Sequence, residues 1–293
     1  MKATISVGMW SLKQYSLKGT KTFDEILETV AEINPDKHID LMEDYVPCHS
    51  QTDMYELLQL KKRIESFGLV INSNWFYTDL IGRVHIQGFE YVVNDLKEYV
   101  IVVAALGAKF MNTPLDSALL PGMMYEEAYG LYIKIYEEII PFAEEHNVII
   151  GIDTGLSEEW CSPITALKLV KDIGSDYLTT TPDFEAWRTP TEDMPGVFIE
   201  TPGSEEKTEA LPLDVFKECL PYSPLLHAKF LTFDENGEEP NYPIAEMMAL
   251  IKQSNREHTF VIEYEGWIPD INPHLDPAVE TKKGIDLLKR YLG

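Results

Sequence analysis

The chain has 293 residues, with 49 acidic and 24 basic side chains and a formal net charge of −25. This charge argues against a nucleic-acid partner, because a phosphate backbone attracts Lys and Arg and repels an acidic surface. An anionic membrane surface is disfavoured for the same reason. Hydrophobic residues make up 45% of the chain and charged residues 25%. This is ordinary globular composition, and the length suits one large domain or two small ones.

The sequence carries no signal for export or for a membrane. No run of about 18 or more apolar residues occurs, so we expect no transmembrane helix. The segment from Met1 to Gly8 lacks the charged and then apolar order of a signal peptide. The cysteines, Cys48, Cys161 and Cys219, are far apart and odd in number, which suits a reducing compartment without disulfides. We therefore expect a cytoplasmic protein.

Short β-branched runs alternate with longer helical patterns along the whole chain. The eight runs that predict strands are Thr4–Met9, His38–Glu43, Leu69–Ser73, Lys109–Thr113, Val148–Asp153, Tyr177–Thr181, Leu225–Phe230 and Thr259–Tyr264. The segments that predict helices are Thr22–Ile33, which opens with a capping box, Thr52–Phe67, about Gln87–Leu106, about Tyr125–His146, a helix starting at Ser162, Leu213–Leu220, Ile244–Lys252, and Asp276 to about Tyr291.

Eight strand-then-helix units predict an α/β fold, a (β/α)8 TIM barrel that forms a single domain over residues 1–293. A doubly wound open sheet is the alternative, but no Gly-x-Gly-x-x-Gly or P-loop follows the first predicted strand. One segment is long for a βα loop: Thr189–Pro212, after the sixth strand, holds four prolines and six acidic residues. It is either a solvated insertion or a lid or partner-docking loop.

In a TIM barrel the active site lies where the strands end, so polar residues at strand ends are the candidates. They are Glu43, Asn72, Asn74, Asp153, Asp183, His227, Lys229, Glu263 and Glu265. Among them Asp153, Asp183, His227 and Glu263 come from four consecutive strands and form an oxygen-rich site with one nitrogen. This ligand set suits Mn²⁺ or Mg²⁺ better than a structural zinc. Singly, each has an ordinary structural explanation, such as a capped turn, a core histidine or an ion pair.

The tryptophans fall at or just after predicted strand ends. They are Trp10, Trp75, Trp160, Trp187 and Trp267. We interpret them as an aromatic rim that suits a sugar face or an aromatic aglycone, the alternative being that they plug the top of the barrel. The other side chains that we assign to substrate binding are Glu43, Asn74, Glu159 and Arg188.

Three motifs make the sequence resemble the xylose isomerase-like TIM-barrel superfamily, also called sugar phosphate isomerase/epimerase. They are Thr181-Pro182-Asp183-Phe184, His227-Ala228-Lys229-Phe230 and Glu263-Tyr264-Glu265-Gly266. Together they look like the branch that contains the catalytic subunits of C-glycoside deglycosidases, which act on 3-keto-glycosides. The resemblance implies metal ligands Glu, Asp, His and Glu on strands five to eight, which correspond here to Asp153, Asp183, His227 and Glu263.

Strand five departs from the pattern of these relatives. Asp153 replaces Glu and is one methylene shorter, so we expect it to reach a metal through water or as a loosened ligand. Many relatives also carry Glu-x-His at this point, where the His is a candidate base, whereas this chain has Asp153-Thr154-Gly155. The base is then expected among Lys229, Glu263 and Glu265, with Asp153 as a further candidate catalytic residue.

The resemblance implies a divalent-metal-dependent sugar isomerase or epimerase that removes a proton next to a carbonyl. Isomerisation, epimerisation and β-elimination all start with that step, and the sequence does not choose among them. One alternative is a C-glycoside deglycosidase subunit that eliminates the aglycone of 3-keto-C-glycosides. Another is a non-catalytic glycoside-binding or partner subunit with a degenerate metal site. A neutral sugar or keto-glycoside fits the net charge of −25 better than a sugar phosphate does. Each of these three functions is compatible with a homo-oligomer, or with a hetero-oligomer that contains a small partner subunit.

Overall fold

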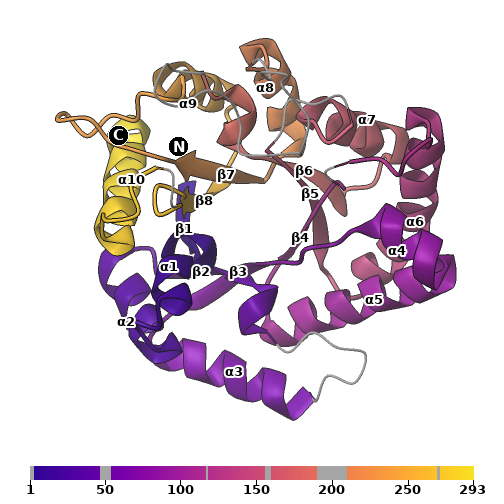
Figure 1. The fold of residues 1–293 in the computed structure, drawn as a ribbon, viewed down its shortest axis with the longest axis horizontal. Helices are drawn as coiled ribbons and strands as arrows, with labels where there is room; N and C mark the ends of the chain where they lie inside the picture. The colour runs from indigo at the N-terminus through magenta and orange to yellow at the C-terminus, as the bar shows by residue number, and fades with distance from the viewer. Residues whose placement is uncertain (1–2, 47–53, 117, 156–159, 190–209, 269–270) are drawn as a thin grey trace.

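A computed structural model describes residues 3–46, 54–116, 118–155, 160–189, 210–268 and 271–293. Its strands are β1 (Ala3–Gly8), β2 (His38–Met42), β3 (Val70–Trp75), β4 (Phe110–Pro114), β5 (Ile149–Thr154), β6 (Leu178–Pro182), β7 (Leu225–Phe230) and β8 (His258–Tyr264). They form one parallel eight-stranded sheet in the order β6-β5-β4-β3-β2-β1-β8-β7. Figure 1 shows the strands around the centre and the helices outside them. The predicted TIM barrel is confirmed.

The barrel closes between β6 and β7 through a single backbone contact. Among the described residues the pairing across this seam is one parallel bridge, Asp183↔His227, whereas every other neighbouring pair of strands forms a ladder, with one register shift between β2 and β3. Asp183 directly follows β6 and His227 lies inside β7. The seam therefore places two of the predicted metal ligands side by side.

Helices surround the sheet. They are α1 (Lys13–Leu17), α2 (Phe23–Ile33), α3 (Met54–Ser66), α4 (Leu80–Gln87), α5 (Phe89–Leu106), α6 (Tyr125–Glu145), α7 (Pro163–Ile173), α8 (Leu213–Cys219), α9 (Ile244–Ser254) and α10 (Pro277–Leu292). Short 3₁₀ turns are η1 (Met9–Leu12), η2 (Glu43–Tyr45), η3 (Phe184–Trp187) and η4 (Leu220–Tyr222). The predicted capping box is present, because Thr22 accepts from the Glu25 amide while Glu25 accepts from the Thr22 amide.

The structure differs from the predicted helices after β1 and after β3. The segment predicted as one helix from about Gln87 is preceded by a separate helix, α4, which Asp79 caps by accepting from the Gly82 amide. Gly88 separates α4 from α5 with φ at 93°, a conformation that side chains with a Cβ rarely adopt. The turn η1 and the helix α1 follow β1 directly and were not expected.

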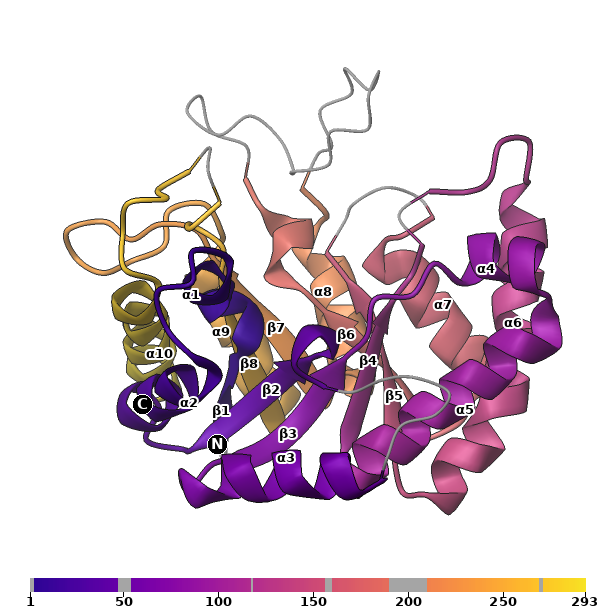
Figure 2. The same ribbon diagram turned by 60° about the horizontal axis from the view of Figure 1, so that its bottom comes forward.

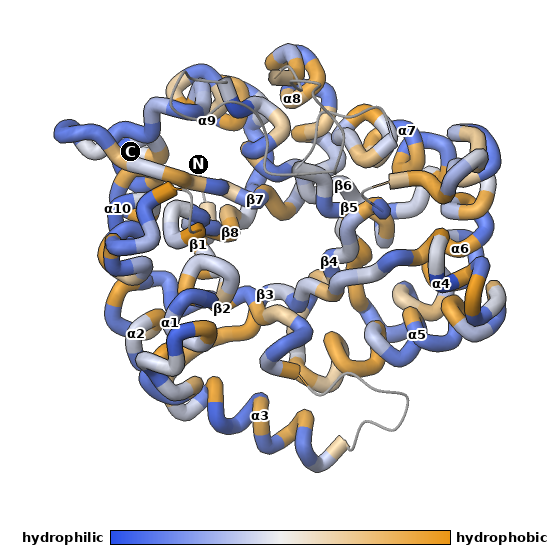
Figure 3. Tube along the Cα trace, viewed as in Figure 1, coloured by the Kyte–Doolittle hydropathy of each residue, from blue (hydrophilic) through white to orange (hydrophobic). Residues whose placement is uncertain are grey.

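The main hydrophobic core lies between the barrel and the ring of helices. Figure 3 shows hydrophobic and hydrophilic residues alternating along these helices, as expected for elements with one buried side. Figure 2 shows α1 and the segments that follow β7 and β8 rising at one end of the barrel, with the N-terminal end of β1 at the other. No helix among the described residues is long and apolar enough to cross a membrane. Residues 190–209, most of the predicted long loop, and Cys48 lie outside the described residues.

Candidate active site

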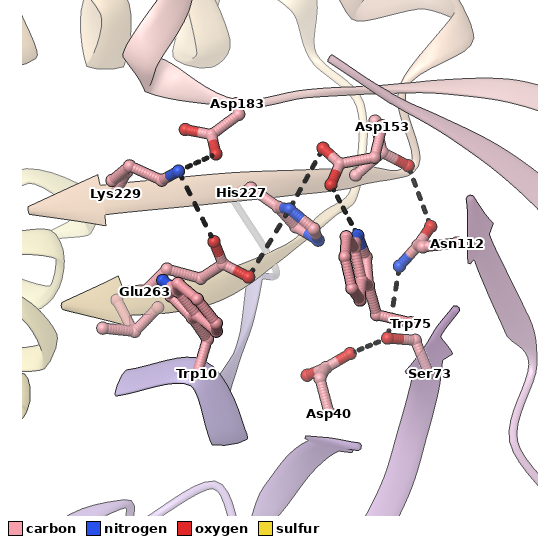
Figure 4. A network of polar contacts seen from close by, with 12 residues as sticks. Trp10, Asp40, Ser73, Trp75, Asn112, Asp153, Asp183, His227, Lys229 and Glu263 are labelled. Atoms are coloured by element: carbon pink, nitrogen blue, oxygen red, sulfur yellow. Dashed lines mark hydrogen bonds and ion pairs between the residues drawn. The ribbon is translucent and has the colours of Figure 1, made fainter. Parts of the chain in front are cut away.

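Asp153, Asp183 and His227 converge at the carboxyl ends of β5, β6 and β7. One potential ligand atom from each lies within 4.8 Å of the others. Their positions follow from the chain, because Asp153 is the last but one residue of β5 and the seam bridge aligns the other two. Glu263 of β8 lies beside them, with its Oε1 3.7 Å from His227 Nδ1. Figure 4 shows these side chains facing one another across the barrel.

Two potential metal-ligand atoms of the cluster are partnered by ion pairs and not by hydrogen bonds. Asp153 Oδ1 and His227 Nδ1 lie 3.2 Å apart as an ion pair. Neither atom makes a well-oriented hydrogen bond among the described residues, and both are buried. A buried polar atom that lacks a hydrogen bond costs free energy, so ligation of a cation by these atoms would be favourable. Oxygen and imidazole ligands around one divalent ion lie up to about 4.4 Å apart, twice a metal–ligand distance. The residues present therefore fit a divalent cation.

Charge is concentrated in this cluster. Burial lowers the pKa of His227, but the carboxylates of Asp153 and Glu263 outweigh it and raise that pKa to about 10. Burial raises the pKa of Asp153, but the charge of His227 and the hydrogen bond from Trp75 outweigh burial. The pKa of Asp153 therefore lies below its usual value. Burial raises the pKa of Glu263 to about 8, although His227 and Lys229 oppose the shift. Without a metal the imidazole is therefore a cation held by carboxylates.

Lys229 brings a second cation to the cluster. Its Nζ lies 2.8 Å from Asp183 Oδ2, 3.1 Å from Glu265 Oε1 and 4.0 Å from Glu263 Oε2. Burial lowers the pKa of Lys229, but these carboxylates outweigh it and hold the pKa well above its usual value. Burial raises the pKa of Asp183, with Lys229 opposing. The ammonium group therefore shares Asp183 with any metal that binds here.

A cavity of about 150 Å³ opens above the cluster, and we call it the first cavity. The titratable side chains in its walls are those of Asp40, Asp153, Asp183, His227, Lys229, Glu263 and Glu265. Two indole rings also line the cavity, and each donates a hydrogen bond to a carboxylate. Trp10 Nε1 donates to Glu265 Oε1 at 2.6 Å, and Trp75 Nε1 donates to Asp153 Oδ2 at 2.8 Å. The cavity thus combines flat aromatic faces with anchored carboxylates, an arrangement that suits a sugar ring.

Two cavity residues, Asp40 and Ser73, escaped the sequence analysis. Asp40 of β2 accepts from the Ser73 hydroxyl and from Asn72 Nδ2, the latter at 2.9 Å. Ser73 in turn accepts from Asn112 Nδ2 at 3.3 Å, as Figure 4 shows. Asp40 lies inside its strand, so the rule that directed us to strand ends passed over it. Ser73 ends the predicted third strand, but its neighbours Asn72 and Asn74 were selected in its place. An acidic residue inside an otherwise apolar strand was the available signal.

The five predicted tryptophans do not form a rim. Trp10 and Trp75 line the first cavity, and Trp267 packs edge-on against Trp10 at 5.2 Å between ring centroids. Trp187 is instead buried beside Phe216 and donates to the Pro212 carbonyl at 3.2 Å. Trp160 is buried against Tyr125 and Tyr132. The ring of five is corrected to two wall residues and one supporting residue, because side chains just past a strand end follow the local turn.

The structure does not bring three other predicted binding residues, Glu43, Asn74 and Arg188, to the first cavity. Asn74 is fully buried on the face of β3 opposite to Ser73 and Trp75, since side chains alternate along a strand. Arg188 is buried and pairs with Glu185 at 3.1 Å. Glu43 accepts from the Tyr77 amide at 3.2 Å. Glu159 lies outside the described residues.

The shortened side chain on β5 reaches the cluster. Asp153, and not Glu263, belongs to the group of three whose ligand atoms lie within 4.8 Å. The hydrogen bond from Trp75 fixes one carboxylate oxygen and directs the other at His227. Gly155, two residues later, adds no side chain near Asp183 and Glu185.

A family model described as xylose isomerase-like TIM barrel matches residues 39–291. The C-glycoside deglycosidase alpha subunit of Arthrobacter globiformis is 38% identical over 56 residues, a segment that spans 19% of this chain and 15% of that protein. A crystal structure of D-psicose 3-epimerase with D-tagatose from Clostridium cellulolyticum H10 has a TM-score of 0.71 at 12% identity, with 99% of each chain covered. A xylose isomerase-like TIM barrel protein from Mycobacterium smegmatis, in complex with magnesium, has a TM-score of 0.66 at 17% identity, with 100% of each chain covered.

The family match covers most of the chain, including every strand from β2 to β8 and the whole carboxylate and histidine cluster. The likeness to the two solved structures extends over the full barrel and shows the same fold. The chain belongs to the xylose isomerase-like TIM barrel family.

Proposed function

We propose that this protein is a divalent-metal-dependent enzyme that moves a proton next to a carbonyl group of a neutral sugar or keto-glycoside. The observation that carries the proposal is the cluster of Asp153, Asp183 and His227, which offers one potential ligand atom from each residue within 4.8 Å of the others in the wall of a cavity. Glu263 is the proposed fourth ligand, since it lies next to His227. A cation held there, Mn²⁺ or Mg²⁺, supplies Lewis-acid polarisation of a carbonyl oxygen.

Proton transfer is assigned to residues beside the cluster. Glu265 lines the first cavity, and its Oε1 accepts from Trp10 and lies 3.1 Å from Lys229. We assign Glu265 as the base that takes the proton from carbon while the electron pair moves to the carbonyl oxygen. The Lys229 ammonium lies where it can donate to a developing oxygen anion. Asp153 orients the site through its contacts with Trp75 and His227.

The second half of the reaction decides the product. Return of the proton to the neighbouring carbon gives isomerisation, and its return to the opposite face of the same carbon gives epimerisation. Loss of a leaving group instead gives β-elimination. The short match to a C-glycoside deglycosidase alpha subunit favours elimination from a keto-glycoside as the second candidate. That relative is an alpha subunit, which implies at least one other kind of subunit. This second candidate function therefore includes a partner subunit.

The walls of the first cavity support a neutral substrate. They carry five carboxyl side chains, from Asp40, Asp153, Asp183, Glu263 and Glu265, against the two cationic side chains His227 and Lys229. This balance disfavours a phosphate group. The faces of Trp10 and Trp75 offer the apolar surface on which the C–H side of a sugar ring packs.

Exchange of a sugar C–H proton for deuterium tests the proposal. Protein loaded with Mn²⁺ is incubated in D₂O with ketohexoses and keto-glycosides, and deuterium incorporation next to the carbonyl is followed by NMR. Glu265→Gln is expected to reduce the exchange rate by about 10²-fold or more. It should leave the metal-induced rise in melting temperature intact. Glu235→Gln, at an exposed loop position, is the matched control. Exchange that persists in Glu265→Gln at the wild-type rate removes Glu265 as the base.

A further inference from the structure

A second cavity of about 170 Å³ adjoins the first on the side of β3, β4 and β5. The two cavities share four lining residues, namely Trp75, Asp153, Asp183 and Lys229. These four side chains therefore separate the two cavities, whereas His227 and Glu263 line the first cavity alone. An apolar cavity of about 150 Å³ is large enough to hold a benzene ring. The second cavity thus has room for one six-membered ring.

The second cavity has aromatic and aliphatic walls. Trp75 and Tyr77 both line it, with ring centroids 6.0 Å apart and planes inclined at 47°. Leu115 adds an aliphatic contact surface. Tyr77 is 58% exposed, so one aromatic face is available to an incoming group without rearrangement of the core. Such inclined rings favour a flat or ring-shaped ligand.

Polar atoms in the same cavity lack partners. Thr78 and Thr154 line it and are 2% and 3% exposed, yet neither hydroxyl has a hydrogen-bond partner among the described residues. Asp116 also lines it: its Oδ2 accepts from the Tyr132 hydroxyl at 2.7 Å, while its Oδ1 is buried without a partner. Three unsatisfied groups in one cavity are unfavourable unless ligand hydroxyls or waters pair with them.

Gly155 keeps the second cavity open. A Cβ placed on Gly155 would meet the nearest atoms of Asp183 and Glu185 at 3.5 Å, an ordinary contact. A methyl group therefore fits there, but a longer side chain extends into the space that Gly155 lines. The cavity depends on the absence of a side chain at this one position.

We propose that the second cavity is a binding subsite for a neutral, hydroxylated six-membered ring that is linked to the sugar in the first cavity. The linking bond would then cross the Asp153 and Asp183 carboxylates. A charged ring is disfavoured, because Asp116, Asp153 and Asp183 repel an anion and Lys229 repels a cation. A phenolic ring and a second sugar ring share the required hydroxyl chemistry. This subsite rests on the proposed function for the position of the sugar, but its own binding can be measured separately.

Binding of small ring probes to the full chain tests the subsite. Catechol represents the phenolic ring and methyl glucoside the sugar ring, and each is followed by saturation-transfer NMR and calorimetry with and without Mn²⁺. Gly155→Leu is expected to abolish binding of the preferred probe. The double variant Thr78→Val, Thr154→Val keeps the volume of both side chains and should weaken that probe by about tenfold or more, as loss of hydrogen bonds worth about 1 kcal/mol each predicts.

Two readouts separate the subsite from damage to the fold or to the metal site. The Mn²⁺-induced rise in melting temperature should be the same in these variants as in wild type. The valine variant should melt no lower than wild type, because it removes two hydroxyls that have no partner. Probe binding that survives Gly155→Leu overturns the subsite, as does the failure of either probe to bind wild-type protein. Probe binding to a protein whose melting temperature does not respond to Mn²⁺ would instead refute the proposed metal-dependent function and leave the subsite standing.

Discussion

Asp183 and His227 are joined by the backbone bridge that closes the barrel between β6 and β7. The bridge fixes the relative position of the two residues before their side chains make any contact. A metal bound between them therefore gains from a geometry that the fold itself supplies. It also means that either side chain can be changed without removing the backbone contact that holds the seam together.

The first prediction concerns metal binding at this seam. Mn²⁺ should raise the melting temperature of wild-type protein, because only the folded chain brings all the ligands together. Asp183→Asn and His227→Ala should abolish that rise. Both should also lower the melting temperature in EDTA, because each breaks a buried ion pair, with Lys229 or with Asp153, although the backbone bridge itself remains. Thermal melts with EDTA and with Mn²⁺ measure both quantities. A full Mn²⁺ effect in either variant would place the metal elsewhere.

The second prediction concerns competition between Lys229 and the metal. Lys229 lies 2.8 Å from Asp183 and 3.1 Å from Glu265, so Lys229→Met leaves buried carboxylates without their ammonium partner. Breaking a buried ion pair costs about 3–5 kcal/mol, and the metal-free variant should melt well below wild type. Mn²⁺ should restore most of the loss, giving a larger rise than in wild type.

A matched control is Lys282→Met, which removes a lysine from an exposed pair with Asp286. Exposed pairs contribute little, so this variant should melt like wild type and show the wild-type response to Mn²⁺. If Lys229→Met responds to Mn²⁺ no more than Lys282→Met does, the ammonium and the metal do not share Asp183.

The third prediction concerns Asp153. Trp75 Nε1 holds one oxygen of Asp153 at 2.8 Å, and the other lies 3.2 Å from His227. Asp153→Glu lengthens the side chain by one C–C bond, about 1.5 Å. The carboxylate can no longer keep both contacts, so we expect equal or weaker Mn²⁺ affinity by calorimetric titration. A tenfold gain in affinity would show that Asp153 is too short for direct ligation, as the comparison with Glu in the relatives first led us to expect.

The fold was predictable because its determinants are local in the sequence. The Thr22 capping box and the Pro after Ser162 lie next to the helices they start, and the strands are short apolar runs. The helix α4 was missed, because the predicted helix began only at about Gln87, next to the Gly88 that separates α4 from α5.

The candidate cluster was predictable for a related reason: the carboxyl ends of all strands in a TIM barrel lie on one face. The directions in which individual side chains point could not be predicted in this way. The strand β3 continues to Trp75, two residues past its predicted end, and this extension turns Asn74 away from the cavity. The turn η3 likewise buries Trp187 under α8. Asp40 and Ser73 are recognised as cavity residues only from the structure, which places them in the cavity wall and joins them by a hydrogen bond.

The fourth prediction concerns pH and the buried carboxyl group of Asp116. Burial, together with the nearby Asp79 carboxylate, raises its pKa to about 7, although Tyr132 and the Ile81 amide donate to it and oppose the shift. Between about pH 4 and pH 7 the folded chain therefore holds a proton that the unfolded chain has lost. The free energy of unfolding should fall as pH rises through this window, by up to about 1.4 kcal/mol per pH unit.

Asp116→Asn isolates this effect, because the amide keeps an oxygen for Tyr132 and does not titrate in this range. Denaturant unfolding at pH 5 and at pH 7.5 should show a smaller loss of stability for the variant than for wild type. Other buried acids contribute equally to both proteins, so the difference between their slopes reports Asp116 alone. Parallel slopes would show that Asp116 is ionised in the folded chain at pH 5.

The last prediction concerns ligand binding in the first cavity. Trp10 and Trp75 line it, whereas Trp187 is buried beside Phe216 away from it. A neutral sugar that packs on the two cavity indoles should change tryptophan fluorescence in wild type and equally in Trp187→Phe. The double variant Trp10→Phe, Trp75→Phe should lose most of that change. Inorganic phosphate should neither mimic nor displace the sugar, because five acidic side chains line the cavity. Displacement of the sugar by millimolar phosphate would show that the cavity recognises anions and would overturn the assignment of a neutral substrate.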